Sequence, residues 1–175
     1  GIGKGYAVDR ILEMGLERGC DNILVNFGHD VRAHGCPPEG GPWRIGLEDP
    51  RDPGRCWCGI MASDRAVATS GDYARNFTVG GKRYGHILDP RTGYPVDNGC
   101  LSVSVISPTC TEAGILSTSA FVLGVDEGAG LITRVHQASG ALVMKTGTCR
   151  TRGFDEYVIS TKTNSAKRDY AQARF

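Results

Sequence analysis

Residues 84–95 read YGHILDPRTGYP and bring a histidine, a carboxylate, an arginine and a hydroxyl close together along the chain. Pro90 removes a backbone donor and fixes its own φ, while Gly93 permits φ > 0 and the close approach of a ligand. A shaped backbone that carries polar side chains is typical of a binding site. The alternative is a hairpin in which Asp89 hydrogen-bonds only its own turn and His86 is half-buried.

The composition favours one globular domain. The chain has 175 residues, of which 40% are hydrophobic, and this is enough to bury a core of its own. Its 20 Lys and Arg residues against 19 Asp and Glu leave a formal net charge of +1. No basic run is long enough to follow a phosphate backbone, so nucleic acid is not expected as a partner. No apolar run is long enough to cross a membrane either.

The seven cysteines are an odd number, so at least one thiol is unpaired within the chain. Cys56 and Cys58 form a CxC pair, but no other spacing completes a zinc-binding pattern. Two interpretations stay open. Most cysteines are small buried apolar residues of a reduced protein, or the chain mixes bridged and free thiols. The full set is Cys20, Cys36, Cys56, Cys58, Cys100, Cys110 and Cys149.

Apolar spacing predicts a first helix over residues 4–19. Its inner face is predicted to carry Val8, Ile11, Leu12 and Gly15. Gly1, Gly3 and Gly5 precede or open this helix, and such an entry exposes N–H groups at the positive end of the helix dipole, where Lys4 adds a charge. This arrangement favours a phosphate, although an ordinary tight turn fits the same residues.

The rest of the chain indicates short strands and two more helices. Strands are predicted over residues 22–27, 31–33, 43–47, 66–73, 101–106, 141–144 and 157–159, with a hairpin over 77–84. Helices are predicted over 112–123, with Ile115, Leu116 and Val122 facing inward, and over 126–136. Because no steady βαβ rhythm is present, the fold class is α+β or mixed α/β, with short, mostly antiparallel strands and a few helices.

Six blocks, in this order, resemble the FAD:protein FMN transferase family, the ApbE-like flavin transferases. They are residues 3–9 (GKGYAVD), 25–30 (VNFGHD), 43–50 (WRIGLEDP), 66–73 (AVATSGDY), 83–93 (RYGHILDPRTG) and 116–124, which begins LST. The resemblance implies the ApbE-like fold, with residues 1–160 as the C-terminal portion of that domain and 161–175 as a flexible tail. The chain opens on Gly1 without a methionine or a signal peptide, so we interpret it as a fragment or a processed piece.

The resemblance also implies an activity. The family transfers FMN from FAD to a threonine or serine hydroxyl of a target flavoprotein, forms a phosphoester and releases AMP, with a divalent metal that is usually Mg²⁺. The implied partners are that acceptor flavoprotein and either the missing N-terminal part or a second polypeptide, which would complete the flavin pocket. Family members are commonly exported and lipid-anchored in bacteria, which implies a periplasmic location or an anchor on the outer side of the inner membrane.

Individual residues take roles by the same resemblance. His86 is assigned as the catalytic group beside the acceptor hydroxyl, and Thr118 and the Gly1 carbonyl are assigned as metal ligands. The aspartate that completes the metal site in the family is replaced by Gly114, and Asp89 is a candidate substitute. The residues assigned to FAD binding are Lys4, Asp9, Ser70, Gly71, Asp72, His86, Leu88 and Asp89.

Three functions therefore remain as hypotheses. An active transferase with an altered metal site is favoured by the intact motifs around His86 and Lys4. A flavin-binding or assembly protein that has lost catalysis is favoured by Gly114, because Mg²⁺ sites usually rely on one or two carboxylates. The third hypothesis is a subunit of a larger complex that keeps the fold as an interaction surface.

Overall fold

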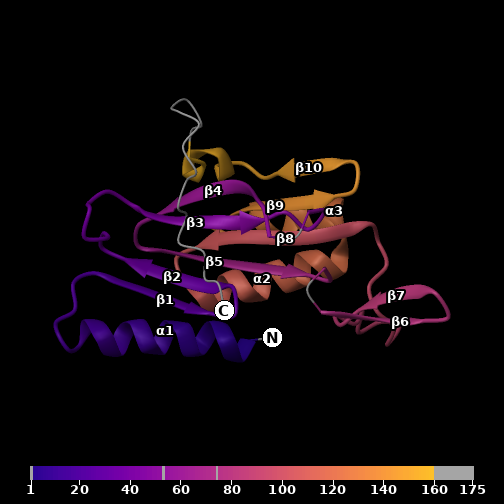
Figure 1. Ribbon diagram of the computed structural model, residues 1–175, viewed down its shortest axis with the longest axis horizontal. Helices are drawn as coiled ribbons and strands as arrows, with labels where there is room; N and C mark the ends of the chain where they lie inside the picture. The colour runs from indigo at the N-terminus through magenta and orange to yellow at the C-terminus, as the bar shows by residue number, and fades with distance from the viewer. Residues whose placement is uncertain (1, 53, 74, 160–175) are drawn as a thin grey trace.

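The computed structural model describes residues 2–52, 54–73 and 75–159 and shows helices packed on one face of a sheet (Figure 1). The helices are α1 (Ile2–Leu16), α2 (Cys110–Leu123) and α3 (Val125–Arg134). The sheet has six strands in the order β1-β2-β5-β8-β9-β10, and every neighbouring pair is antiparallel. The strands are β1 (Ile23–Phe27), β2 (Asp30–His34), β5 (Arg65–Gly71), β8 (Cys100–Ser107), β9 (Ser139–Met144) and β10 (Gly147–Arg150). The predicted α+β class is confirmed.

Two smaller sheets accompany the main one. Strand β3 (Trp43–Glu48) pairs with β4 (Cys56–Ala62), and β6 (Asn76–Val79) forms a hairpin with β7 (Lys82–Gly85). A 3-10 helix covers Phe154–Tyr157. The β3–β4 pair lies along the main sheet, whereas the β6–β7 hairpin extends from the body of the domain (Figure 1).

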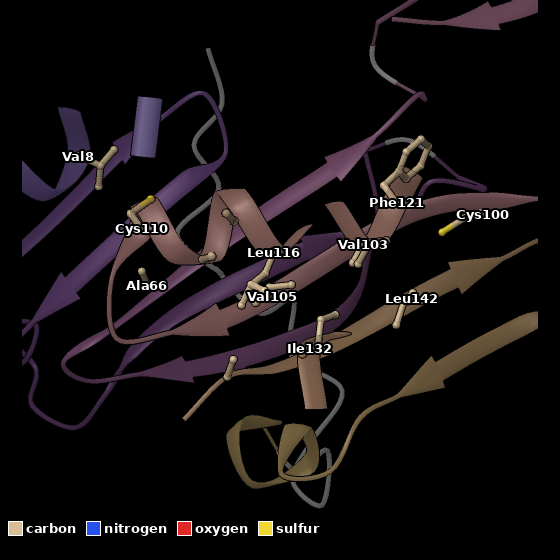
Figure 2. Packing of buried hydrophobic residues seen from close by; sticks show 14 residues of the cluster. Val8, Ala66, Cys100, Val103, Val105, Cys110, Leu116, Phe121, Ile132 and Leu142 are labelled. Atoms are coloured by element: carbon tan, nitrogen blue, oxygen red, sulfur yellow. The ribbon is translucent and has the colours of Figure 1, made fainter. Parts of the chain in front are cut away.

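Side-chain alternation on the central strand β8 divides the core into two clusters. Val103 and Val105 are buried on the face covered by the helices, where Leu116 of α2 packs with them (Figure 2). Ile106 points to the opposite face and joins a cluster that includes Ile60 of β4. Successive residues of a strand point to opposite faces, so the alternation seen in the sequence builds a sheet that is buried on both sides.

Helices α1 and α2 touch at a glycine. Helix α1 begins at Ile2, so Gly3 and Gly5 both lie inside it. A Cβ atom at position 5 would lie 2.6 Å from the carbonyl oxygen of Cys110, whereas a Cβ at position 3 would meet nothing within 4 Å. Glycine at position 5 therefore permits the close approach of the two helices.

Two residues predicted to face inward are exposed. Ile11 is 52% exposed and Ile115 is 42% exposed. The buried face of α1 instead carries Gly5, Val8, Asp9 and Leu12. The periodicity was ambiguous at both positions, because an apolar neighbour, Leu12 or Leu116, occupies the buried side.

The prediction of a strand over residues 157–159 is wrong. This segment follows the 3-10 helix, Val158 makes an isolated bridge with Ile60, and the Ile159 amide donates to the Gly59 carbonyl at 2.8 Å. Strands β4 and β10 were not predicted. The predicted tail, 161–175, lies outside the described residues.

Within the described ranges, no helix has both the length and the apolar character needed to span a membrane.

All seven cysteines are free thiols. Cys20 and Cys36 are exposed, while Cys100 and Cys110 are buried in the helix-side cluster. Burial raises the pKa of the Cys100 thiol to about 11 and that of the Cys110 thiol to about 12. Because the thiolate is the reactive form, these two thiols should be inert in the folded protein.

We expect alanine at position 5 to lower the free energy of unfolding by about 1–3 kcal/mol, because the new methyl group would press on the backbone of α2. The matched control is Gly3→Ala in the same helix. Its Cβ enters open space, and it should raise stability by up to about 1 kcal/mol through helix propensity. Urea unfolding of the two variants measures the difference. Equal effects would contradict the close helix contact.

Alkylation with iodoacetamide at pH 8 should modify Cys20 and Cys36 first. Cys100 and Cys110 should react only after unfolding, because both burial and a raised pKa suppress their thiolates. Peptide mass spectrometry after timed quenching gives the order of reaction. Native-state labelling of Cys110 as fast as that of Cys36 would refute the burial of Cys110.

Candidate functional site

A pocket of about 570 Å³ lies where five segments far apart in the sequence meet. The segments are the first turn of α1, the turn between β1 and β2, the end of β5 with the residues after it, residues 86–88, and the middle of α2. Its lining residues are Lys4, Gly28, His29, Asp30, Thr69, Ser70, Gly71, Tyr73, Arg75, His86, Ile87, Leu88, Gly114 and Thr118. The packing of α1 and α2 on the sheet thus assembles one site from distant motifs.

Lys4 connects α1 to the β1–β2 turn. Its Nζ lies 2.9 Å from Oδ2 of Asp30 and donates to the carbonyl oxygen of Gly28 at 3.1 Å. Asp30 is only 6% exposed, so its charge depends on this partner. Gly28 and His29 both have positive φ, 59° and 73°, and for histidine this backbone conformation is uncommon. The turn that presents Asp30 to Lys4 is therefore tightly shaped.

Three hydroxyl groups form a cluster between β5 and α2. The Ser70 Oγ lies 2.9 Å from Ser117 Oγ and 3.0 Å from Thr118 Oγ1. The Ser117 hydroxyl also donates to the Gly114 carbonyl oxygen at 3.2 Å. Gly114 and Thr118 are four residues apart on α2, so they lie on the same face of the helix, and both line the pocket.

His86 has one ring nitrogen fixed by the backbone. Its Nδ1 lies 3.1 Å from the Arg75 carbonyl oxygen. A carbonyl can only accept a hydrogen bond, so Nδ1 donates in this contact, and in the neutral ring Nε2 is then an acceptor. The β6–β7 hairpin, in which Phe77 and Tyr84 stack with ring centroids 5.6 Å apart, leads directly to His86. The sequence therefore places an oriented imidazole at the pocket.

Residues 87–96, which follow His86, form a turn held by hydrogen bonds within the segment. The Asp89 amide donates to the Tyr94 carbonyl at 2.8 Å, and the Val96 amide donates to the Ile87 carbonyl at 2.9 Å. Asp89 Oδ1 accepts from the backbone N and the Nε of Arg91, both at 2.9 Å, and Oδ2 accepts from an Arg91 terminal nitrogen at 2.7 Å. The hydrogen bonds from Arg91 hold the pKa of Asp89 below its usual range. This carboxylate thus stabilises its own turn.

The structure brings six of the predicted site residues to the pocket: Lys4, Ser70, Gly71, His86, Leu88 and Thr118. Asp9, Asp72 and Asp89 do not line it, and Gly1 lies outside the described residues. The pocket is also lined by His29, Asp30 and Arg75, which are not among the assigned site residues. Gly28, which precedes His29 and Asp30, indicates a turn. This turn was the sequence feature that could have indicated that both residues belong to the site.

Asp9 connects α1 to the start of α2, and its contribution to FAD binding stays a prediction. Its Oδ1 accepts from the Cys110 amide at 2.8 Å, and its Oδ2 accepts from the amide of Thr111 at 2.9 Å and from the hydroxyl of Thr111 at 2.6 Å. Arg32 of β2 also donates to Oδ1 at 2.9 Å. A carboxylate beside the N-terminus of a helix is stabilised by its free N–H groups. Asp9 therefore holds the helices that carry Lys4 and Thr118.

Asp72 is paired beside the site. Its Oδ1 lies 3.2 Å from a terminal nitrogen of Arg83, and that guanidinium also donates to the Asp72 carbonyl at 2.9 Å. The contact joins the residues after β5 to strand β7 of the hairpin. Asp72 thereby fixes the approach to His86, and its contribution to FAD binding stays a prediction.

A second, smaller pocket of about 270 Å³ shares His29, Thr69 and Tyr73 with the first. It lies between the main sheet and the β3–β4 pair, and Glu48 is also part of its wall. Burial, together with the adjacent Glu48 carboxylate, raises the pKa of Tyr73 above its usual range. The Tyr73 phenol therefore stays protonated and able to donate a hydrogen bond at physiological pH.

The described residues do not fit a magnesium site. Among them, no group of three His, Cys, Asp or Glu side chains is placed to hold a metal ion. Thr118 offers a neutral hydroxyl, and the position one turn before it is Gly114. Asp89, the candidate substitute, lies outside the pocket and is bound by Arg91. Mg²⁺ usually requires one or two carboxylates, so the anionic part of a site is missing here.

Comparison with known proteins gives consistent matches. The model of the ApbE family matches residues 1–143. The FAD:protein FMN transferase of Vibrio cholerae serotype O1 is 36% identical over 161 residues, which cover 91% of this chain and 47% of that protein. The FAD:protein FMN transferase of Haemophilus influenzae is 39% identical over 128 residues, which cover 72% of this chain and 37% of that protein.

Solved structures agree with this match. The crystal structure of the ApbE protein of Thermotoga maritima superposes with a TM-score of 0.82 at 37% identity, over 91% of this chain and 52% of that one. The flavin transferase ApbE of Vibrio cholerae superposes with a TM-score of 0.77 at 33% identity, over 88% and 50%. The chain thus spans about half the length of the relatives it matches.

Replacing Asp9 with alanine should lower the free energy of unfolding by about 3–5 kcal/mol, because Arg32 and the α2 amides would lose a buried charged partner. Urea unfolding measures this loss. The control is Asp52→Ala, whose exposed pair with Arg55 should contribute at most about 1 kcal/mol. A loss no larger than that of the control would contradict the anchoring role of Asp9.

Proposed function

The chain belongs to the ApbE family, and from this premise we propose that it serves the transfer of FMN from FAD to a threonine or serine hydroxyl of an acceptor flavoprotein. The observation that carries the proposal is that Lys4, Ser70, His86 and Thr118 line the same pocket. These residues come from four separate motifs, which the sequence relates to one another only through the family resemblance. The names of the relatives, FAD:protein FMN transferases, support the same reaction.

In the proposed reaction the acceptor hydroxyl oxygen attacks the phosphorus of the FMN half of FAD. A new phosphorus–oxygen bond forms, and the bond between that phosphorus and the oxygen bridging to the AMP phosphate breaks. AMP leaves with the electron pair of that bond, and the hydroxyl proton moves to a base. The protein must therefore hold a diphosphate, position a hydroxyl and accept one proton.

His86 fits the role of the base. With Nδ1 donating to the Arg75 carbonyl, Nε2 has a free lone pair that can take a proton from a hydroxyl. The fixed Nδ1 contact also sets the orientation of the ring, in the way that a second hydrogen bond orients many catalytic histidines. His86 lines the pocket beside Leu88, where the resemblance implies that FAD is bound.

Lys4 and Arg75 fit the binding of the diphosphate. Both line the pocket, and guanidinium and ammonium groups form strong, charge-assisted hydrogen bonds with phosphate oxygens. Positive charge there would also stabilise the negative charge that develops on the AMP phosphate as it leaves. The resemblance implies a Mg²⁺ ion as well, but the described residues do not fit one, and no step proposed here depends on it.

A second candidate function follows from Gly114. If a carboxylate at this position is required for catalysis, the protein binds flavin, or assists assembly of a larger complex, without transferring it. The two candidates differ in one measurable property. A transferase leaves covalent flavin on an acceptor and releases AMP, whereas a binding protein retains FAD intact.

We also propose that residues 1–160 are the C-terminal portion of a flavin transferase domain, completed by an N-terminal part or a second polypeptide. The family match over residues 1–143 and the half-length coverage of the relatives support this. From the resemblance alone we propose a location on the outer side of a bacterial inner membrane, where an acceptor flavoprotein would be met.

Replacing His86 with glutamine should reduce the rate of FMN transfer by about 10²–10⁴, because the variant lacks a proton acceptor. The assay uses the full-length protein, FAD and an acceptor flavoprotein, and follows covalent flavin by in-gel fluorescence and AMP by chromatography. His136, an exposed histidine after α3, provides the control His136→Gln, which should retain full activity.

The same assay separates the two candidates. Transfer by the wild-type protein that is lost in His86→Gln supports the transferase and its base. Bound FAD with neither transfer nor AMP release in the wild type would replace the transferase with the binding protein. Unchanged transfer in His86→Gln would remove His86 from the catalytic role.

A further inference from the structure

The oxygen donors at the α2 side of the pocket are neutral and already hydrogen-bonded to one another. Ser70 Oγ lies 2.9 Å from Ser117 Oγ and 3.0 Å from Thr118 Oγ1, and Ser117 donates to the Gly114 carbonyl at 3.2 Å. Hydroxyl and carbonyl oxygens carry no net charge. A divalent cation placed among them would lose much of its hydration without gaining an anionic ligand.

The carboxylates near the pocket are already paired with cations. Asp30 is the one acidic residue among the described residues that line it, and its Oδ2 lies 2.9 Å from Lys4 Nζ. Asp72 and Asp89 do not line the pocket and are bound by Arg83 and by Arg91 respectively. A metal ion bound to any of them would have to share the carboxylate with its cationic partner, which reduces the negative charge available to the metal.

Cationic groups outnumber anionic ones on the described lining. Among the described lining residues, Lys4 and Arg75 carry positive charge and Asp30 is the single carboxylate. In the described ranges, the Arg75 side chain makes no ion pair and no hydrogen bond, since its contact with His86 uses the backbone carbonyl. A guanidinium in this condition is available for a bidentate bond with phosphate oxygens.

We propose that this pocket binds the diphosphate of its ligand directly through Lys4 and Arg75, without a divalent metal ion. The inference rests on the proposed function, because FAD is the diphosphate ligand which that function requires. It changes how the pocket neutralises charge: cationic side chains do what a metal ion and its carboxylate do in the family that this chain resembles.

Position 114 allows a direct test. A Cβ atom there would meet nothing within 4 Å, so a side chain can be added without a clash. An aspartate at 114 would place a carboxylate one helical turn before Thr118, on the face that lines the pocket. The missing carboxylate therefore reflects the residue at 114 and not a lack of space.

The experiment measures the affinity of the full-length protein for ADP by calorimetry, once in EDTA and once in excess Mg²⁺. ADP carries the diphosphate without the flavin and needs no acceptor protein. For the wild type we expect dissociation constants within twofold of each other in the two buffers. For Gly114→Asp we expect binding at least fivefold weaker in EDTA, because the added charge repels the diphosphate, and recovery in Mg²⁺.

The matched control is Gly114→Asn, which adds the same volume without the charge and should behave like the wild type in both buffers. In EDTA, Arg75→Gln should weaken ADP binding about tenfold or more, because a charge-assisted hydrogen bond is lost. Its control, Arg134→Gln, changes an exposed arginine at the end of α3 and should have no effect.

Wild-type binding that weakens tenfold or more in EDTA would overturn the inference, as would the absence of ADP binding in both buffers. An Arg75→Gln variant that binds as tightly as the wild type would overturn the assignment of Arg75. These results are independent of the transfer assay. A protein that transfers FMN but binds ADP only with Mg²⁺ would keep the proposed function and lose this inference.

Discussion

The arrangement of the domain depends on the carboxylate of Asp9. It accepts hydrogen bonds from two backbone amides and one hydroxyl at the start of α2, and it pairs with Arg32 of β2. One buried side chain therefore fixes helix α1, helix α2 and the sheet relative to one another. Lys4 lies before Asp9 on α1 and Thr118 lies after Thr111 on α2, so their meeting in one pocket follows from this contact and from the close approach at Gly5.

Charge around the pocket is sorted into local pairs. Asp30 meets Lys4, Asp72 meets Arg83 and Asp89 meets Arg91, and each pair joins or shapes a segment of backbone. Acidic residues that resemble ligand-binding residues in the sequence thus form ion pairs that stabilise the fold. Within the part of the chain that the structure describes, the pocket offers a ligand a set of hydroxyl groups, an oriented imidazole and the Arg75 guanidinium without an ion-pair partner, which together suit an anion.

Hydrophobic alternation and turn residues within one segment predicted much of the fold. Contacts between residues far apart in the sequence could not be predicted from such local patterns. Alternation over residues 101–106 predicted β8, and the two-glycine turn predicted the β6–β7 hairpin. Strand β4 lacks simple alternation because it contributes buried residues without a clear polar face, and it was missed. At the site, motifs pointed to Lys4, His86 and Thr118. Asp9 was assigned to FAD by the resemblance alone, and its contacts at the start of α2 could not be read from the sequence because they join residues about a hundred positions apart.

In the proposed transfer reaction, the pair between Lys4 and Asp30 has a consequence for turnover. A lysine whose charge is already balanced by a buried carboxylate attracts a phosphate less strongly than a free lysine does. An enzyme that must release an anionic product after every cycle benefits from this weaker attraction, because slow dissociation of a very tightly bound product would limit the rate. By balancing the charge of Lys4, the Asp30 carboxylate would then favour rapid release of the product over tight binding.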